Sequence, residues 1–305
     1  MKAARIHAYG HSDRVEIEDI AQPTQSSDDV LVRIRAAGIN PVDWKIREGY
    51  LAKGAPRSFP FTLGQDFCGE VLAIGADVTD VECGDEVYGF ANGAYAENAV
   101  VAPTMIASKP RTVDDATAAG LPTPGLTALQ IVANHVDPRQ GQTILIHGAA
   151  GGVGAIATQL CIAKGARVVA TASSRDSSYL TSLGVARVID YATERFEDEV
   201  SNVDAVIDLV GGETLARSLP VIRDGGVLVT SVGAIDDAET ARRKIRGTRL
   251  VMQKKRLDLV ELARLVDLGV IKPRRGRVLS LADAARAQDM IQAGQTTEKL
   301  VLSIS

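Results

Sequence analysis

The sequence has few cysteines: its 305 residues include 3, namely Cys68, Cys83 and Cys161. They are too few and too scattered for a disulfide framework or a C-x-x-C metal site. A reducing cytoplasm is therefore the compartment we expect. Histidine is scarce as well, and no two histidines have a convincing ligand spacing. A structural role is expected for His7, His11, His135 and His147.

Long apolar runs and a strong charge imbalance are also missing. No stretch approaches the ~18 consecutive apolar residues of a membrane span, and the N-terminal residues lack the apolar core of a signal peptide. The formal net charge of −4 gives no reason to expect nucleic acid as the main partner. At 46% hydrophobic content the chain can bury substantial cores, so we expect a soluble protein of two domains without a membrane span.

The most informative feature that is present is a glycine-rich turn. Thr143–His147 has the pattern of a buried strand, the sequence Gly-Ala-Ala-Gly-Gly-Val-Gly follows, residues 155–164 suit a helix, and residues 166–171 suit a second strand. Such a βαβ unit is typical of a dinucleotide site, although a merely structural turn is the alternative. Gly151 would let the backbone approach a pyrophosphate, and Gly154 would let the helix pack closely. The expected cofactor contacts in the turn are Ala150, Gly151, Gly152 and Val153.

The end of the second strand indicates which cofactor is bound. An Asp or Glu there would accept hydrogen bonds from a ribose 2′-hydroxyl, but the residues are Ser173, Ser174 and Arg175. Two hydroxyls and a cation suit the 2′-phosphate of NADPH better. The two serines could also cap a helix that begins near Asp176, and both roles can coexist.

Hydrophobic periodicity divides the chain into a β-rich part and an α/β part. Short alternating strands are expected at residues 29–37, 67–74, 86–90 and 94–101. From about residue 116, helices and strands alternate, with strands at 143–147, 166–171, 187–190, 205–209, 227–231 and 249–253, as in a doubly wound parallel sheet. A helix at 257–268 follows, then a strand near Arg277, a helix at 281–293 and a strand at 300–304. The expected domains are 1–115, 116–271, and a return of 272–305 to the first domain.

Several motifs in order resemble the quinone oxidoreductase branch of the medium-chain dehydrogenase/reductase superfamily. They are Ala37-Gly-Ile-Asn-Pro-Val-Asp-Trp44, Gly64-Gln-Asp-Phe-Cys-Gly-Glu-Val71, Gly84-Asp-Glu-Val-Tyr-Gly89, Gly93-Ala-Tyr-Ala-Glu97, Leu126-Thr-Ala128 and the glycine turn. The stretch from Asn40 to Arg47 looks like chloroplast-envelope quinone oxidoreductase homologues and NADPH-dependent alkenal reductases. The resemblance implies an α/β protein with a GroES-like β-rich catalytic domain, a Rossmann domain, and a cleft between them.

The resemblance also implies a reaction without zinc. Where zinc alcohol dehydrogenases of this architecture carry metal ligands, this sequence has Asn40, Gln65 and Asp66, and amides are poor zinc ligands. Without a Lewis acid, hydride transfer from NADPH to a quinone or an α,β-unsaturated carbonyl compound is the better hypothesis. A non-catalytic NADPH-binding sensor or interaction protein is the main alternative, and a zinc alcohol dehydrogenase is a third.

The family pattern, residue chemistry and position in the chain together indicate candidate site residues, with Tyr50 supported by position alone. Asn40 is expected to contact the nicotinamide and substrate region, Gln65 and Asp66 to line the site, and Tyr50 to be an aromatic wall or proton donor. Each assignment has a structural alternative. Asn40 and Asp43 could equally cap the helix that starts near Pro41. Asp66 could instead hold its loop together, and Tyr50 could be a surface residue. The expected cofactor contacts outside the turn are Asp43, Thr127, Ser173, Ser174, Arg175, Tyr191, Val210, Gly211, Val232, Gly233 and Ala234.

The chain carries one conspicuous basic run, from Arg242 to Arg256. Such a run is most often a solvated face; alternatively it closes over the cofactor phosphate or borders the substrate mouth, with an RNA surface a distant third. A glycine-lysine pair usual in the family reads Glu298-Lys299 here. The expected edge strand at 249–253 could pair with a second copy in a homodimer.

Overall fold

A computed structural model describes residues 1–296 and 298–304 of the chain, which folds into two compact units. The first unit comprises residues 1–123, 254–267 and 273–305, and the second comprises residues 124–253 and 268–272. Among the described residues, no helix has both the length and the apolar character needed to cross a membrane.

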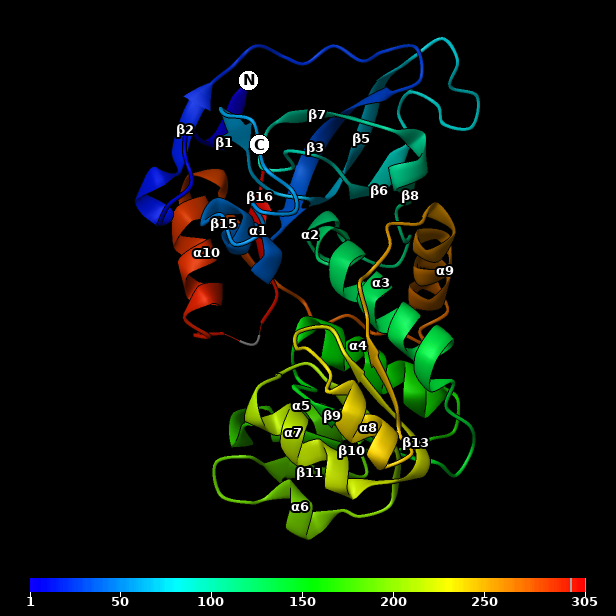
Figure 1. Cartoon of the computed structure of the whole chain (residues 1–305). Coiled ribbons are helices and arrows are strands. Elements are labelled where there is room, and N and C mark those ends of the chain that lie inside the picture. The colour runs from blue at the N-terminus through cyan, green and yellow to red at the C-terminus, as the bar shows by residue number, and fades with distance from the viewer. Residues whose placement is uncertain (297, 305) are drawn as a thin grey trace. The chain divides into compact units, whose positions relative to one another are not determined.

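The first unit is β-rich, as expected, and most of its strand pairs are antiparallel (Figure 1). A three-stranded sheet has the order β2-β1-β4, and a larger sheet has the order β15-β16-β3-β5-β6-β8 with β7 paired to β3. These strands are β1 (Lys2–Ile6), β2 (Glu16–Asp19), β3 (Val30–Gly38), β4 (Phe61–Thr62), β5 (Asp66–Ile74), β6 (Glu86–Phe90), β7 (Asn98–Val101), β8 (Ile106–Ser108), β15 (Arg277–Ser280) and β16 (Leu300–Ser303).

Helices cover the sheets of the first unit. They are α1 (Pro41–Arg47), α2 (Asp115–Ala119), α9 (Arg256–Asp267) and α10 (Ala284–Gln292), with short 3₁₀ turns at Ser12–Arg14, Pro103–Met105 and Leu281–Asp283. Alternation along β3 buries Val30, Val32 and Ile34 in the core, and β16 contributes Leu300 and Leu302 to the same core. The C-terminal strand therefore returns to the first unit because its apolar residues complete that core.

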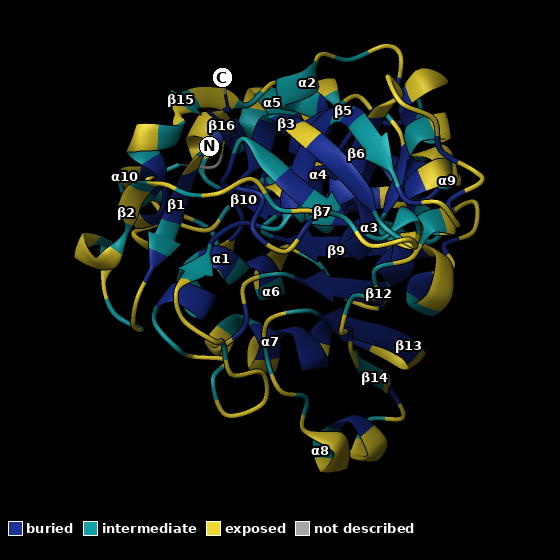
Figure 2. Cartoon of the chain, turned by 90° about the horizontal axis from the view of Figure 1, so that it is seen from above, coloured by how far each residue is buried: buried dark blue, intermediate teal, exposed yellow. Residues whose placement is uncertain are grey.

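The second unit is a six-stranded parallel sheet of order β11-β10-β9-β12-β13-β14. This is the order 3-2-1-4-5-6 of a Rossmann sheet, so the expected doubly wound architecture is confirmed. Figure 2 shows β9 and β12 in the colour of buried residues, which agrees with their apolar sequences. The strands are β9 (Thr143–His147), β10 (Arg167–Ala172), β11 (Arg187–Asp190), β12 (Val203–Asp208), β13 (Ile222–Thr230) and β14 (Arg246–Arg249).

Helices of the second unit alternate with these strands. They are α3 (Pro122–Ile131), which starts two residues before the unit does, α4 (Gly152–Ala163), α5 (Ser177–Ser182), α6 (Phe196–Glu199), α7 (Glu213–Ser218) and α8 (Asp237–Arg242). A π-helical turn spans Val132–Val136, and 3₁₀ turns span Ser174–Asp176 and Leu219–Val221.

Three local expectations differ from the structure. The last strand of the parallel sheet is Arg246–Arg249, so the expected strand at 249–253 is wrong. At Gln253, both backbone groups bind the side chain of Gln130 and not a neighbouring strand. The Gln253 N–H donates to Gln130 Oε1 at 3.0 Å, and the Gln253 carbonyl accepts from Gln130 Nε2 at 2.7 Å. Residues 94–97 precede β7 and do not belong to it, because Tyr95 pairs with the backbones of Ala4 and Leu63.

The third difference concerns α9, which was expected in the second domain. It belongs to the first unit, where it packs against β8 and where its Leu259 carbonyl accepts a hydrogen bond of 2.5 Å from the buried Tyr88 hydroxyl. Burial of a tyrosine favours such a partner for its hydroxyl group. This contact joins residues that lie far apart in the sequence, so local periodicity could not assign the helix.

Candidate active site and nucleotide-binding turn

A buried polar cluster in the first unit joins Asn40 to Asp66. Asn40 precedes α1, Asp66 begins β5, and both side chains are buried. Asn40 Nδ2 donates to Asp66 Oδ2 at 2.9 Å. Thr123 donates to the same carboxylate twice, from its backbone N–H at 2.9 Å and from its hydroxyl at 2.6 Å. Because these donors satisfy Asp66, the carboxylate has a structural role in addition to any role toward a substrate.

Lys299 supplies a cation to this cluster. Its ammonium donates to Asn40 Oδ1 at 2.5 Å and to the Ile39 carbonyl at 2.9 Å. Burial lowers the pKa of Lys299, while the charges of Asp66 and Asp43 favour its protonated form. The orientation of the Asn40 amide follows from its neighbours, since an ammonium can only donate and an ionised carboxylate can only accept. Within residues 1–296 and 298–304, Asn40 Nδ2 has Asp66 as its one acceptor, so its second N–H is available for a ligand.

Asp43 lies in the first turn of α1 and completes the cap of that helix. Asp43 Oδ2 accepts from the Asn40 backbone N–H at 2.7 Å and from the buried Tyr95 hydroxyl at 2.9 Å. Burial raises the pKa of Asp43 to about 7. Among the described residues, none donates to Asp43 Oδ1. The expected capping role is thus observed, and a contact of Asp43 with the cofactor stays a prediction.

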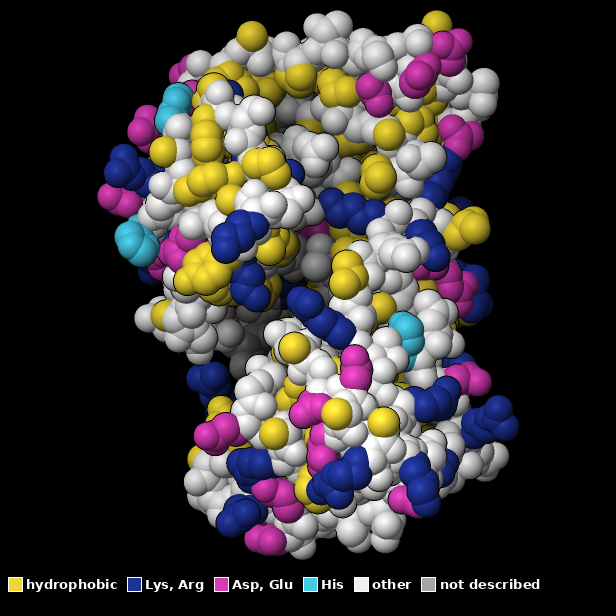
Figure 3. Space-filling view, in the orientation of Figure 1, with side chains coloured by type: hydrophobic (Ala, Val, Ile, Leu, Met, Phe, Trp, Pro, Cys, Tyr) yellow, Lys and Arg dark blue, Asp and Glu magenta, His cyan; other side chains and the backbone are white. Residues whose placement is uncertain are grey.

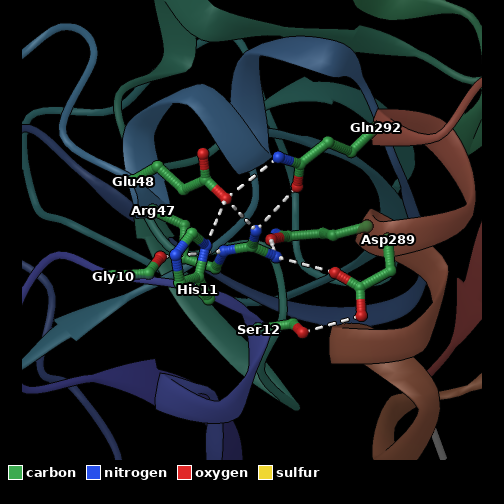
Figure 4. A network of polar contacts seen from close by, with 8 residues as sticks. Gly10, His11, Ser12, Arg47, Glu48, Asp289 and Gln292 are labelled. Atoms are coloured by element: carbon green, nitrogen blue, oxygen red, sulfur yellow. Dashed lines mark hydrogen bonds and ion pairs between the residues drawn. The ribbon is translucent and has the colours of Figure 1, made fainter.

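An arginine at the other end of α1 fixes the helix in place (Figure 4). Arg47 is fully buried, and its guanidinium donates to Gln288 at 3.0 Å and to Gln292 at 2.9 Å, both on α10. It also donates to Glu48 at 2.9 Å and to the Gly10 carbonyl at 3.3 Å. Contacts at both ends therefore hold α1, so the helix presents Asn40 and Asp43 in a defined position.

The other residues expected near the site lie in different environments. Gln65 is half-buried, and its Oε1 accepts from Lys254 Nζ at 2.6 Å, which leaves its amide N–H groups able to donate. Tyr50 is 68% exposed, and its ring packs edge-on against Trp44. Cys68 is buried, and burial raises the pKa of its thiol, so it is a small core residue without the character of a reactive thiolate.

The positions expected to replace zinc ligands do not fit a metal ion. A divalent cation bound by Asn40 would lie beside the Lys299 ammonium and would be repelled by it. Among the described residues, one group of three potential ligands lies close enough to share an ion: His7, which follows β1, and Glu16 and Glu18 on β2. None of these three residues is among Asn40, Gln65 and Asp66, the positions expected to replace zinc ligands.

The glycine turn of the second unit follows β9 as expected. Gly148 has φ of +71°, and α4 begins at Gly152. A Cβ atom on Gly154 would lie 2.3 Å from the Gly148 carbonyl oxygen, which is a steric clash unless the backbone moves. A Cβ atom on Gly151 would lie 3.4 Å from the same oxygen, which is an ordinary contact. Gly154 is thus required for packing of α4 against the turn, whereas the fold itself tolerates a side chain at Gly151.

The other expected cofactor contacts follow the carboxyl ends of the parallel strands. The buried Asp208 side chain at the end of β12 accepts from the N–H groups of Val210 and Gly211 and so orders the turn after that strand. Thr127 is buried on α3. The exposed side chains at this edge include Ser174, Arg175, Tyr191, Val210 and Val232. This edge of an open parallel sheet is where such folds bind ligands.

Two details at this edge were not expected from the sequence. Asp176 next to Arg175 is buried, and its carboxylate lies 3.5 Å from Arg175 Nε. Ser173 precedes the 3₁₀ turn at Ser174–Asp176 but makes no capping hydrogen bond through its side chain. The expected capping role of Ser173 is therefore not observed, and Ser174 is exposed beside Arg175.

His147 at the end of β9 has a structural role, as expected. Ser218 Oγ donates to the Thr214 carbonyl, so it accepts from His147 Nε2 at 3.0 Å, and Nδ1 accepts from the Thr171 hydroxyl at 2.9 Å. Burial lowers the pKa of His147 to about 4. The imidazole is thus a neutral core residue with both nitrogen atoms occupied.

Four of the eight basic residues in the run from Arg242 to Arg256 pair with acidic residues in the described part of the chain. Arg242 and Arg243 contact Glu239, Lys244 contacts Asp224, and Arg256 contacts Asp80. On the face shown in Figure 3, Lys and Arg side chains are interspersed with Asp and Glu. Half of the run is therefore an ion-paired surface, and Lys254 differs because its partner is the neutral amide of Gln65.

Comparisons with known proteins agree with this architecture. Residues 26–111 match the alcohol dehydrogenase GroES-like domain family, and residues 183–302 match the family described as zinc-binding dehydrogenase. The chain is 30% identical to quinone oxidoreductase of Mus musculus over 325 aligned residues, which cover 99% of this chain and 97% of that protein. The chain belongs to the quinone oxidoreductase branch of the medium-chain dehydrogenase/reductase superfamily and is an oxidoreductase.

Two further comparisons extend the match. The chain is 33% identical to the NADPH-dependent alkenal/one oxidoreductase of Arabidopsis thaliana chloroplasts over 286 residues, covering 90% of this chain and 71% of that protein. The crystal structure of Escherichia coli quinone oxidoreductase complexed with NADPH superposes with a TM-score of 0.90 at 26% identity and covers 99% of this chain and 100% of that chain. A GroES-like domain followed by a Rossmann sheet is therefore the fold of this protein.

Proposed function

We propose that this chain is an NADPH-dependent reductase that transfers hydride to quinones or α,β-unsaturated carbonyl compounds without zinc. The observation that carries the proposal is the glycine turn at the carboxyl end of β9, where Gly154 lets α4 start against the strand. β9 lies between β10 and β12, at the point where the strand order of the sheet reverses. A pyrophosphate is expected at that helix N-terminus and switch point.

The preference for NADPH over NADH rests on the end of β10. Arg175 is 56% exposed on its side chain, and Ser174 beside it is exposed. The neighbouring acid, Asp176, is buried beside Arg175, so its charge is partly compensated. A 2′-phosphate would gain charge-assisted hydrogen bonds from Arg175 and the serines. The preference for NADPH is also supported by two relatives, the NADPH-dependent alkenal/one oxidoreductase of Arabidopsis thaliana and the Escherichia coli quinone oxidoreductase complexed with NADPH.

The independence from zinc rests on Lys299. Its ammonium occupies the side of Asn40 on which a metal ion would have to bind. When bound, NADPH supplies the hydride, and the protein is left to orient the acceptor and to donate hydrogen bonds to its oxygen. Asn40 and Gln65 each keep amide N–H groups for that purpose. Asp66 positions Asn40, and Tyr50 is proposed as an exposed aromatic contact of the acceptor.

The test is an absorbance assay at 340 nm with NADPH or NADH against quinones, 2-alkenals and simple ketones. The proposal predicts oxidation of NADPH by quinones or alkenals, slower reaction with NADH, and none with simple ketones. Tight NADPH binding without turnover of any acceptor would contradict it and favour a non-catalytic NADPH-binding protein. Turnover of simple alcohols with bound zinc would favour an alcohol dehydrogenase.

We also propose a homodimer that acts in the cytoplasm. The edge strand β14 leaves one side of the parallel sheet open, and Val251 just after it is 74% exposed. Pairing of such an edge with a second copy would remove it from solvent. All three cysteines are free, which suits a reducing compartment. Light scattering of the purified protein tests the dimer, and a monomeric mass would contradict it.

A further inference from the structure

Lys254 has no acidic partner within the part of the chain that the structure describes. It lies two residues before α9, it is half-buried, and among those residues its ammonium has one hydrogen-bond acceptor, the amide oxygen of Gln65 at 2.6 Å. The ammonium also lies 4.9 Å from the centre of the Phe90 ring. Other basic residues of the same run pair with carboxylates. An ammonium has three N–H groups, so two remain available for a ligand.

The Lys254 side chain lines a cavity of about 350 Å³ within the first unit, a size typical of small-molecule sites. Six of the nine residues that line it are apolar: Phe90, Ala91, Val100, Val101, Ala102 and Met105. Asn92 and Asp29 are the remaining polar residues, and Asp29 already accepts from the Ser26 hydroxyl at 2.7 Å. A ligand of this cavity therefore needs an apolar body and one electron-rich oxygen for Lys254.

Lys254 connects this cavity to the predicted catalytic residues. Gln65, which accepts its hydrogen bond, lines a second, smaller hollow together with Asp43, Arg57 and Asn92. Asn92 lines both spaces. An oxygen bound by Lys254 would thus lie close to the amide of Gln65, so two donors could converge on it. A desolvated cation at that place is worth more to a developing negative charge than the same cation in water.

We propose that Lys254 is a catalytic residue that binds the carbonyl oxygen of an apolar quinone or enone in this cavity and protonates it during reduction. The inference rests on the proposed function, which supplies NADPH as the reductant. As hydride adds to the acceptor carbon, an electron pair of the conjugated system moves onto the carbonyl oxygen. An O–H bond forms there as an N–H bond of Lys254 breaks, and solvent then returns a proton to the amine. NADPH is oxidised to NADP⁺, and the acceptor gains two electrons.

The environment of Lys254 suits proton donation. Burial lowers the pKa of Lys254, and the nearby positive charge of Arg57 acts in the same direction. The carboxylates of Asp43 on α1 and Asp66 on β5 oppose this effect, and Asp29 before β3 lines the same cavity. The protonated form is the active one, so kcat is expected to fall as pH rises through the pKa of Lys254.

The test compares Lys254→Met with Lys255→Met, a change at the exposed neighbour. With the best acceptor, Lys254→Met is expected to lower kcat by about 100-fold, the usual effect of losing one such donor, while the Kd for NADPH stays unchanged. Lys255→Met should match the wild type. Lys254→Arg keeps the positive charge, but a guanidinium stays protonated because its pKa is far higher than that of an amine. The kcat of this variant should therefore be reduced and should not fall further at alkaline pH.

Equal kcat and KM in the two methionine variants would overturn the role of Lys254 while leaving the proposed function intact. An alkaline decrease of kcat that persists in Lys254→Arg would overturn its role as proton donor. Failure of the wild-type protein to oxidise NADPH with any quinone or enone would instead overturn the proposed function. Thermal unfolding of each variant separates these results from loss of the fold, and Lys254→Arg keeps the test available if Lys254→Met does not fold.

Discussion

The ammonium of Lys299 lies 2.5 Å from Asn40 Oδ1, although 259 residues separate the two in the sequence. This contact fixes the Asn40 amide and places a positive charge near the buried carboxylates of Asp43 and Asp66. Lys299→Met should therefore lower the free energy of unfolding by about 1.5–3 kcal/mol, the range for a hydrogen bond to a charged group, and should also lower kcat.

Chemical denaturation and steady-state kinetics of Lys299→Met check this expectation, with Lys53→Met at an exposed loop position as the control. A variant as stable and as active as the wild type would show that the contact between Lys299 and Asn40 has no importance for the site.

Two glycines of the nucleotide-binding turn should respond differently to alanine. Gly154→Ala places a methyl group 2.3 Å from the Gly148 carbonyl oxygen, so backbone must move and the melting temperature should fall. Gly151→Ala makes only a 3.4 Å contact, so the fold should tolerate it while NADPH binding weakens, because the methyl group stands where the pyrophosphate is expected. Calorimetric melting and NADPH titration of both variants make the comparison. Unchanged NADPH affinity in Gly151→Ala would contradict the proposed phosphate site.

The sequence predicted this turn well because its determinants are local. An apolar strand, a glycine turn and a helix follow one another within about 20 residues, and a parallel sheet buries such strands on both faces. The expected strand at 249–253 failed for a non-local reason, since the Gln130 side chain takes both backbone groups of Gln253. The helix α9 was placed in the wrong unit for the same kind of reason, because its partners on β8 and β6 are distant in the sequence.

Arg175 should determine the preference for NADPH. Removing a charge-assisted contact to the 2′-phosphate costs about 1.5–3 kcal/mol, so Arg175→Ala should raise the Kd for NADPH by about 10- to 100-fold and leave that for NADH unchanged. Titration of both cofactors, with Arg195→Ala on the exposed start of α6 as the control, measures this effect. Equal weakening of both cofactors, or of neither, would contradict the assignment.

His147 should make the protein less stable in acid. Its pKa is about 4 in the folded protein, below the ordinary 6.5, so its contribution is fully present above pH 6.5 and is lost as pH falls through 4. The shift corresponds to about 3 kcal/mol. His147→Asn should be less stable than the wild type at pH 7.5, and this difference should shrink by pH 4.5. Urea unfolding at both pH values, with His135→Gln as the control, tests this expectation; a difference independent of pH would contradict it.

The candidate site could be predicted only in part from the sequence. The motif around Asn40 indicates which residues surround the site, because α1 and β5 place them through local structure. The charges that act on those residues come from elsewhere: Lys299 from the C-terminal region and Lys254 from the segment before α9. A lysine within a basic run looks like a surface residue until the structure shows that it lines an apolar cavity.

Turnover without bound metal is the most direct test of zinc-independent reduction. The protein would be dialysed against a chelator, its zinc content measured by mass spectrometry, and NADPH oxidation followed with the best quinone or alkenal acceptor. We expect full activity with zinc far below one ion per chain, since Lys299 already provides the positive charge beside Asn40. Loss of activity on chelation, with recovery when zinc is added back, would contradict it.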